Sequence, residues 1–391
     1  MAFFLGILLV IFAWLGHVVL WVAIVNRLHA YALPRKLIDL ATLASGLLLV
    51  LLVWPLLLVT AQQLAIPTSY TLGMAPGPLS TAYAWFCAAV AVGGMLGRLY
   101  LACHKELVGV VRDRKSHLLP LPYGPHELLA PGLPRLVGSL PGNQVLRPVV
   151  TELELAIPQL PVGFQGLRIA HLSDLHLSGR IGQGYLEAID DATNQLAPDL
   201  VVVTGDIVER PQCLDWIAPS LGRVDPRAAR LFVLGNHDRH VGPDNVRQAM
   251  TAAGFLNLGG LSESIDLPHG TCIAAGNETP WFGQAPSLPW AGQEPLDCNT
   301  FRLALIHTPD LFGWCAAQRF HLALAGHNHG GQVRLPLLGA ILAPSRYGVR
   351  YASGAFRRQE TVLHVSQGTS CLAPLRYNCP PELSLLVLVP A

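Results

Sequence analysis

The front of the chain is a series of long apolar stretches separated by short polar connections. Three stretches reach the length of about 20 residues that an α-helix needs to cross the hydrocarbon core of a bilayer. They predict transmembrane helices at residues 3–25, 37–60 and 79–103. The first stretch differs from a cleaved signal peptide, because its apolar part is too long, its start lacks basic residues and no small-residue cleavage site follows it.

Gly93 and Gly97 form a G-x-x-x-G pair in the third stretch. Such a pair can bring two membrane helices into close contact. The alternative is that both are small residues in a helix that tolerates them, and the sequence leaves both interpretations open.

Basic residues are distributed unevenly around these stretches. The first connection contains Arg27, Arg35 and Lys36, whereas residues 61–78 contain no basic residue. A basic cluster marks the end of the third stretch: Arg98, Lys105, Arg112, Arg114 and Lys115. Because basic residues stay on the cytoplasmic side, we expect an integral membrane protein with a defined orientation. Its N-terminus would be outside and the rest of the chain would face the cytoplasm.

Residues 111–150 are rich in Pro, Gly and Leu and show no clear period. We interpret them as a linker between the transmembrane region, residues 1–110, and a folded domain, residues 151–391. Residues 151–157 alternate polar and apolar side chains, which predicts an edge strand at the start of that domain.

Beyond residue 167, short apolar runs alternate with stretches of helical character. Helices are expected at residues 182–196 and 243–253, with another between residues 204 and 231. Strands are expected at the apolar runs: 167–172, 199–204, 231–234, 264–267, 271–275, 303–306, 321–325, 361–365 and 383–388. Strands that alternate with helices favour parallel pairing through crossover connections. The domain is therefore expected to be α/β, with a second half richer in strands.

Five polar islands directly follow or close these apolar runs. They are Asp174-Leu-His176, Gly205-Asp206, Gly235-Asn236-His237-Asp238, His307 and Gly326-His327-Asn328-His329. Ligands bind to open α/β sheets at the carboxyl ends of neighbouring strands. Carboxylate, imidazole and amide groups together suit divalent metals. The islands therefore predict a two-metal hydrolytic site, and they favour a ligand role for His307, which alone would be read as a structural histidine.

The order D-x-H, G-D, G-N-H-D, His and G-H-x-H resembles the calcineurin-like metallophosphoesterase superfamily over residues 165–390. A single Gly-Asp or His-x-His occurs by chance, whereas all five islands in this order are specific. The segments at residues 326–333 (GHNHGGQV), 335–336, 366–368 and 376–383 (RYNCPPEL) are similar to its membrane-associated bacterial branch, the YkuE and YaeI group.

The resemblance implies an αββα metallophosphoesterase sandwich, preceded here by the three transmembrane helices. Together with the orientation it implies an integral protein of the bacterial inner (cytoplasmic) membrane, with its catalytic domain facing the cytoplasm. It also implies two divalent metal ions, with Mn²⁺ as the first choice and Fe²⁺ or Zn²⁺ as alternatives. Asp206 would bridge them, since a carboxylate is well suited to lie between two metals. The implied ligands are Asp174, His176, Asp206 and His329 for the first ion, and Asp206, Asn236, His307 and His327 for the second.

The chemistry implied by the resemblance is hydrolysis of a phosphate ester by a hydroxide held between the two metals. His237 is the expected general acid for the leaving group, and Asp238 is expected to orient its other ring nitrogen. The alternative for Asp238 is to cap the next turn. Gly205, Gly235 and Gly326 are expected where the backbone turns tightly beside the site.

Composition limits the possible classes of protein. Only 13% of the 391 residues are charged and the mean hydropathy is +0.41, so the chain is too apolar for an ordinary soluble protein. The formal net charge of +1 argues against a nucleic-acid partner. The eight cysteines are scattered without a C-x-x-C pair, which is typical of reduced thiols and not of a disulfide framework.

The sequence as a whole predicts a membrane-anchored, dimetal-dependent phosphoesterase that hydrolyses a phosphodiester, pyrophosphate or phosphomonoester bond. The anchor favours membrane lipids as partners and a lipid-linked substrate of the UDP-diacylglucosamine or phospholipid type. Two alternatives remain: an enzyme of soluble substrates that is merely anchored, and a metal-binding membrane protein without turnover. The intact His237 and Asp238 argue against the second alternative. No oligomeric state is predicted.

Overall fold

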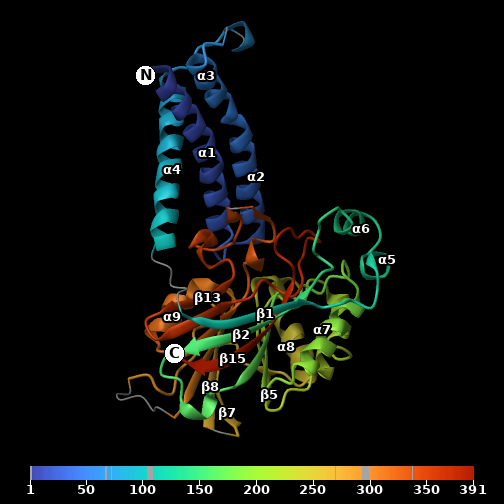
Figure 1. Cartoon of the computed structure of the whole chain (residues 1–391). Helices are drawn as coiled ribbons and strands as arrows, with labels where there is room; N and C mark the ends of the chain where they lie inside the picture. Colours follow the sequence, from blue (N-terminus) through green and yellow to red (C-terminus); the bar gives the residue numbers. More distant parts are fainter. Residues whose placement is uncertain are drawn as a thin grey trace. The chain divides into compact units, whose positions relative to one another are not determined.

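The computed structural model describes residues 2–66, 68–71, 73–103, 109–268, 270–292, 299–336 and 338–391. The chain divides into two compact units, residues 1–105 and 106–391. The first unit is helical, and the second is built on β-sheets (Figure 1).

The first unit consists of apolar helices: α1 (Ala2–Leu28), α2 (Arg35–Leu51), α3 (Val53–Gln63) and α4 (Pro78–Cys103). Three segments among the described residues have the length and composition of membrane spans: Phe3–Leu28, Lys36–Gln63 and Pro78–Tyr100. The three long apolar helices expected from the sequence are thereby confirmed. The second span is interrupted at Leu52, between α2 and α3, because Pro55 has no N–H group to bond the carbonyl group of Leu51.

Helix α1 approaches α4 closely at Gly16. A Cβ atom at this position would lie 1.7 Å from the carbonyl oxygen of Cys87, so a larger side chain would force the helices apart. Among the described residues, a Cβ atom at Gly93 or Gly97 would meet no atom within 4 Å. The close helix contact is therefore at Gly16, and within this unit Gly93 and Gly97 are small residues that the helix tolerates.

The described part of the second unit contains a seven-stranded and a six-stranded mixed sheet. In spatial order, the first sheet contains β1 (Val111–Leu118), β2 (Val149–Ile157), β15 (Glu382–Pro390), β3 (Arg168–Leu172), β4 (Leu200–Thr204), β5 (Ala229–Val233) and β6 (Leu256–Asn257). The second contains β13 (Gly354–Arg358), β14 (Thr361–Val365), β10 (Leu322–Ala325), β9 (Phe301–Ile306), β8 (Gly270–Asn277) and β7 (Ser262–Leu267).

The strands that lead to the polar islands are parallel within each sheet. In the first sheet β3, β4 and β5 run in the same direction, and in the second sheet β8, β9 and β10 do so. Helices α7 (Gln183–Gln195) and α9 (Phe312–Ala317) lie in the connections from β3 to β4 and from β9 to β10. Within each sheet, the carboxyl ends of these strands therefore lie at one edge.

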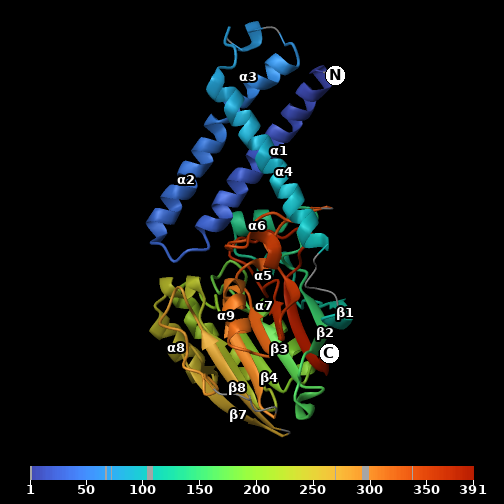
Figure 2. The ribbon, with the colours of Figure 1, turned by 90° about the vertical axis from the view of Figure 1, so that its left-hand side faces the viewer.

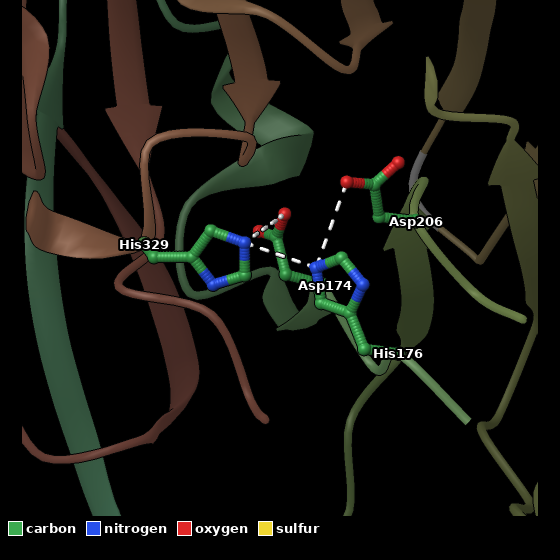
Figure 3. A group of neighbouring side chains, drawn as sticks. All are labelled: Asp174, His176, Asp206 and His329. Carbon is green, nitrogen blue, oxygen red and sulfur yellow. Dashed lines mark hydrogen bonds and ion pairs between the residues drawn. The ribbon is translucent and has the colours of Figure 1, made fainter. Parts of the chain in front are cut away.

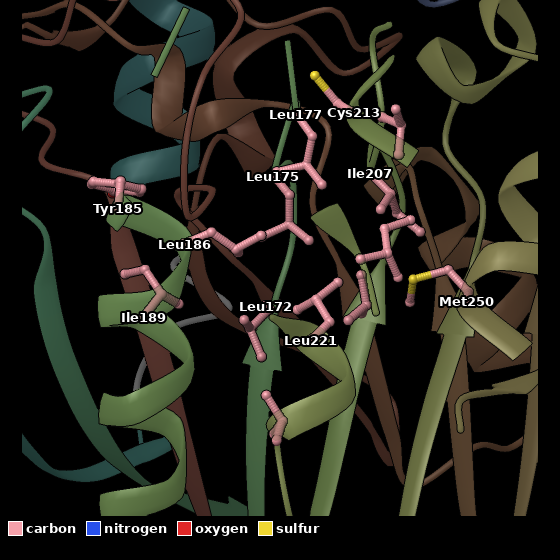
Figure 4. Packing of buried hydrophobic residues seen from close by; sticks show 14 of the residues in the cluster. Leu172, Leu175, Leu177, Tyr185, Leu186, Ile189, Ile207, Cys213, Leu221 and Met250 are labelled. Atoms are coloured by element: carbon pink, nitrogen blue, oxygen red, sulfur yellow. The ribbon is translucent and has the colours of Figure 1, made fainter. Parts of the chain in front are cut away.

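The two sheets pack face to face, and helices cover their outer faces (Figure 2). Along β4, Leu200 and Val202 belong to the core between the sheets, whereas Val201 and Val203 belong to the core beneath α7 and α8 (Pro243–Ala252). Figure 4 shows part of this outer core. Because both faces of β4 are buried, its sequence is a continuous apolar run. On the other side, α9 packs Phe312 against the second sheet. The expected αββα sandwich is confirmed.

Residues 111–150 differ from the expected linker. They contain β1, α5 (Pro125–Leu128) and α6 (Leu133–Gly138), and β1 pairs with β2 along its length. The sequence does not predict β1, because its residues from Arg112 onward are exposed and carry no apolar alternation. Charged side chains are typical of edge strands. As a consequence, β2 is an interior strand and not the expected edge strand.

The connection between β4 and β5 also differs from the sequence prediction. In place of the expected helix it contains 3₁₀ turns at Pro211–Trp216 and Leu221–Arg223. Gly222 lowers the helix propensity of this stretch, and the two turns pack the side chains of Cys213 and Leu221 beneath the first sheet.

Replacing Gly16 with Val is expected to weaken the contact between α1 and α4, because its Cβ atom would overlap the carbonyl group of Cys87. Forcing extra volume into a close contact costs about 1–3 kcal/mol, so the detergent-solubilised variant should unfold at a lower temperature. Gly93→Val is the matched control, with the same chemical change at an open position of α4. Equal losses from the two substitutions would contradict the close contact.

Candidate metal centre

Five loops at the carboxyl ends of strands bring their polar side chains into one buried cluster. Three loops follow β3, β4 and β5 of the first sheet, and two follow β9 and β10 of the second. The oxygen Oδ1 of Asn236 joins the cluster through His307 Nε2, at 3.1 Å. All seven expected ligand side chains are therefore brought together: Asp174, His176, Asp206, Asn236, His307, His327 and His329.

The first group consists of Asp174, His176, Asp206 and His329, with one ligand atom of each within 4.8 Å of the others (Figure 3). The Nε2 atoms of His176 and His329 are 3.0 Å apart. His329 Nε2 lies 3.4 Å from Asp174 Oδ1, and His176 Nε2 lies 3.6 Å from Asp206 Oδ2. Two imidazole nitrogens and two carboxylate oxygens thus converge on one small space, as a divalent transition metal requires.

The second group consists of Asp206, His307 and His327. His307 Nε2 lies 3.3 Å from Asp206 Oδ1 and 3.1 Å from His327 Nδ1. Asp206 therefore belongs to both groups, with Oδ2 toward the first and Oδ1 toward the second. A carboxylate in this position can bridge two metal ions.

Glycines allow the five loops to approach one another this closely. A Cβ atom at Gly235 would lie 2.3 Å from Asp206 Oδ1, and one at Gly326 would lie 1.7 Å from Ser173 Oγ. Gly205 has a φ of +85°, which disfavours a side chain. The tight turns expected at these glycines are confirmed. Positive φ values also occur at five of the expected ligands: Asp174, His176, Asp206, His327 and His329. Such strain costs about 1–3 kcal/mol per residue and is concentrated at functional sites.

The burial of the cluster suits metal binding. Burial raises the pKa of Asp174, lowers the pKa of His327 to about 3 and lowers the pKa of His329. The two imidazoles are therefore neutral and keep a lone pair, which is the form that binds a metal. A bound cation would in turn favour the ionised form of Asp174. The residues present thus fit a metal centre.

The ring nitrogens that face away from the cluster have partners of their own. His176 Nδ1 contacts Glu209 Oε1 at 2.5 Å. His307 Nδ1 contacts the carbonyl oxygen of Thr204 at 2.7 Å. An acceptor in this position holds the proton on the outer nitrogen and leaves the inner nitrogen free to bind a metal.

Glu209 also contacts His237, the expected general acid. Its Oε1 lies 2.6 Å from His237 Nδ1, so the Nε2 atom of the ring is left for a substrate. Burial opposes the ionisation of Glu209, but the hydrogen bonds from His176 and His237 lower its pKa to about 2. Glu209 is absent from the residues predicted from the sequence, although an acid three residues after Asp206 was an available signal.

Asp238 does not orient His237, so the role expected for it is wrong. Its Oδ1 accepts hydrogen bonds from the backbone N–H groups of Ile207 and Val208, at 2.9 and 3.0 Å. Its Oδ2 accepts one from the N–H group of Gly235 at 2.8 Å, which agrees with the alternative capping role. Asp238 therefore ties the loop after β5 to the loop after β4.

Trp281 forms an aromatic wall beside the second group. The centroid of its ring lies 5.0 Å from that of His327 and 5.6 Å from that of His307. The residue is half-buried and follows β8, in a stretch where the sequence shows no recognisable motif. No sequence signal would have found it, because its position depends on how the turn after β8 folds over the neighbouring strands.

The chain is similar to known proteins over the region that contains this centre. The family model for calcineurin-like phosphoesterases matches residues 167–331, which include all seven expected ligands. The chain is 30% identical over 243 residues to the uncharacterized metallophosphoesterase YkuE of Bacillus subtilis, covering 61% of this chain and 84% of YkuE. It is 32% identical over 230 residues to the phosphodiesterase YaeI of Escherichia coli, covering 57% of this chain and 82% of YaeI. A transmembrane protein with a metallophosphoesterase domain from Danio rerio is 28% identical over 265 residues, covering 63% of this chain and 58% of that protein.

Glu209→Gln is expected to weaken metal binding about 10–100-fold, because the acceptor that orients His176 loses its charge. Asp238→Asn is expected to act mainly on stability instead. An amide has a single acceptor oxygen, so at least one of three buried N–H groups loses its partner, at a cost of about 1–3 kcal/mol. Titration with Mn²⁺ and thermal unfolding of the metal-free protein would measure the two effects. The assignment of roles fails if Asp238→Asn weakens metal binding more than Glu209→Gln does.

Proposed function

The chain belongs to the calcineurin-like phosphoesterases, and from this membership we propose that it is a membrane-anchored hydrolase that uses two divalent metal ions to cleave a lipid-linked phosphate ester. The observation that carries the proposal is the position of Asp206, whose two oxygens face two separate groups of imidazoles. The bond would be a phosphodiester, pyrophosphate or phosphomonoester. A phosphodiester is supported by the relative YaeI, which is named as a phosphodiesterase.

The two groups of side chains would each hold one ion. Mn²⁺ is the first choice, with Fe²⁺ or Zn²⁺ as alternatives, because imidazole, carboxylate and amide ligands suit these metals. When bound, the ions would lower the pKa of a water molecule, orient the phosphate and neutralise charge on its oxygens. The first ion would be held by Asp174, His176, Asp206 and His329, and the second by Asp206, Asn236, His307 and His327.

His237 would donate a proton to the leaving oxygen. Its contact with Glu209 fixes the proton on Nδ1 and leaves Nε2 for the leaving group. The backbone N–H group of His237 donates to Asp206 Oδ1 at 2.9 Å, which holds the ring beside the ligands. Glu209 would therefore serve both metal binding and proton donation. The same oxygen orients His176, a ligand of the first ion, and His237, the general acid.

A membrane location supports a lipid substrate. The described part of the chain has three segments of membrane-spanning length, and relatives include proteins named as transmembrane proteins with a metallophosphoesterase domain. The positive-inside rule, applied to Arg27 and Lys36, would place the second unit in the cytoplasm at a bacterial inner membrane. Membrane lipids would then be its partners, and a UDP-diacylglucosamine or phospholipid type of ester its substrate. A soluble phosphate ester is the alternative, and no nucleic acid is proposed as a partner.

Product analysis of the detergent-solubilised protein with Mn²⁺ tests the substrate. A mixture of lipid-linked and soluble phosphate esters would be offered, and phosphorus NMR would identify the products, with Asp206→Asn as the blank. We expect cleavage of a lipid diphosphate or phosphodiester in preference to soluble esters. Cleavage of soluble esters alone would reject the lipid substrate, and no cleavage with Mn²⁺, Fe²⁺ or Zn²⁺ would reject the proposed hydrolysis.

His237→Ala is expected to lower the turnover number about 10²–10⁴-fold, which is the usual contribution of a general acid. It should retain most of the bound metal, because His237 is in neither of the ligand sets proposed for the two ions and lies beside them with His176 and Glu209. Asp206→Asn should lose metal as well as turnover, since an amide has one acceptor oxygen where the carboxylate has two. Metal content by plasma mass spectrometry, measured beside initial rates, separates these cases. An unchanged rate in His237→Ala would exclude it as the acid.

A further inference from the structure

A segment close to the metal centre carries exposed leucines. Strands β11 (Arg334–Leu335) and β12 (Gly339–Ala340) form a hairpin five residues after the ligand His329. The hairpin and the loop after it expose Leu335, Leu338 and Leu342 by 42%, 57% and 53%. Large apolar side chains that are exposed together mark contact surfaces.

Helix α6 and the turn after it extend this apolar surface. They expose Leu133, Leu136 and Leu140 by 71%, 68% and 42%. Tyr377 joins the two parts, because its carbonyl oxygen accepts from the N–H group of Arg334 at 2.9 Å and its hydroxyl group donates to the carbonyl oxygen of Pro141 at 3.1 Å. In Figures 1 and 2, α6 and the orange-red loops of the hairpin region lie at the same end of the second unit. We use the name leucine rim for these six exposed residues: Leu133, Leu136, Leu140, Leu335, Leu338 and Leu342.

The leucine rim is fixed to the metal centre by hydrogen bonds. The ligand His327 contacts the carbonyl oxygen of Pro344 through Nε2 at 2.8 Å, two residues after Leu342. On the other side of the hairpin, Arg334 Nε donates to the carbonyl oxygen of Gly330 at 2.7 Å, directly after the second histidine of the G-H-x-H island. The rim therefore cannot move far without moving two metal ligands.

The segments that carry the leucine rim contain basic but no acidic residues. Residues 128–151 and residues 311–359 include no Asp or Glu. Arg147 in the first segment is exposed. The side chain of Arg346 in the second is 48% exposed, and its Nε atom lies 3.5 Å from Oδ2 of the buried Asp310. An apolar surface on segments that carry exposed arginines is suited to anionic lipid headgroups above an apolar interior.

The chain itself keeps the second unit within reach of a bilayer. Helix α4, the third segment of membrane-spanning length, ends at Cys103, and β1 begins at Val111. Even a fully extended chain would place the start of β1 no more than about 28 Å from the end of α4. A lipid surface is therefore always close to this unit, whereas a soluble partner would have to diffuse to it.

We propose that the leucine rim docks on the lipid bilayer, with its leucines at the boundary of headgroups and acyl chains. Arg147 and Arg346 would then lie at the level of the lipid phosphates. The docking itself does not depend on which bond is cleaved. Its consequence for catalysis rests on the proposed function, because a site held at headgroup level receives a lipid phosphate ester without extracting the lipid from the membrane.

Depth-dependent quenching in the full-length protein tests the docking. An environment-sensitive fluorophore would be attached at Leu136→Cys or Leu342→Cys, one in each half of the rim, in a Cys103→Ser and Cys298→Ser background. The cysteines at positions 87, 213, 272, 315, 371 and 379 are buried. Val162→Cys is the control, because Val162 is 90% exposed and precedes β3, at the opposite end of the strands from the ligands. The protein would be reconstituted in vesicles of phosphatidylcholine and phosphatidylglycerol.

A nitroxide carried on the lipid chains is expected to reduce the fluorescence at positions 136 and 342 by about twofold or more, and to leave position 162 unchanged. Equal quenching at all three positions, or none at 136 and 342, would overturn the proposal. The outcome is independent of turnover. Quenching at the rim without cleavage of any lipid ester would therefore reject the lipid substrate and support the docking. Cleavage of a lipid ester without quenching at the rim would reject the docking and support the lipid substrate.

A paired substitution tests the consequence for catalysis. The double variant Leu136→Asp, Leu342→Asp should cleave a vesicle-borne ester about tenfold more slowly, because a buried carboxylate is costly at the lipid boundary. Its rate on a soluble ester should stay unchanged, since both leucines are exposed and neither belongs to a ligand group. Val162→Asp is the matched control and should alter neither rate. Equal loss of both rates in the double variant would show damage to the fold and not loss of docking.

Discussion

The second unit is organised around a buried carboxylate that two groups of imidazoles share. Asp206 is only 1% exposed, so its charge must be compensated by the protein and not by water. Burial acts to raise its pKa, but His307 and the other imidazoles around it hold that pKa well below its usual range. The same carboxylate leaves no room for a side chain at Gly235. The loops can therefore meet only where they surround the carboxylate of Asp206 with hydrogen-bond donors and imidazoles. This requirement constrains the turns that follow the strands.

The ligands could be predicted from the sequence because each follows or closes an apolar run that is visible as a buried strand. The partners of the ligands could not. Glu209 and Asp238 are acids that stand three residues after Asp206 and one residue after His237. Proximity in the sequence favoured Asp238 as the partner of His237, yet Glu209 makes the contact. The choice depends on the directions of two loops, and the positive φ of Asp206 sets one of them. A backbone conformation of this kind is not apparent from the order of residues.

The edge strand β1 and the close contact between α1 and α4 also could not be predicted from the sequence. Apolar periodicity reports burial, so it identifies β4 but not β1, whose side chains are exposed and whose hydrogen bonds are made by the backbone. In the first unit, composition identifies the three spans but does not say which faces meet. The G-x-x-x-G pair at Gly93 and Gly97 drew attention to α4, whereas the close approach is at Gly16 of α1. A single glycine in an apolar helix carries no periodic signal.

The distance between the two ligand groups depends further on how the two sheets are held together, since the second sheet supplies His307 and the G-H-x-H island. The core between the sheets is mainly apolar, but His171 on β3 and His364 on β14 meet within it, with their Nδ1 atoms 2.9 Å apart. Burial lowers the pKa of both, that of His364 to about 4, so both rings are neutral and one must donate while the other accepts.

His171 Nε2 also contacts Thr204 Oγ1 at 2.8 Å, and the carbonyl oxygen of Thr204 contacts His307 Nδ1 at 2.7 Å. Apolar contacts tolerate sliding, whereas hydrogen bonds restrict both length and direction. This chain of contacts from β14 to His307 therefore fixes the register of the two sheets at the point where they hold the metal ligands.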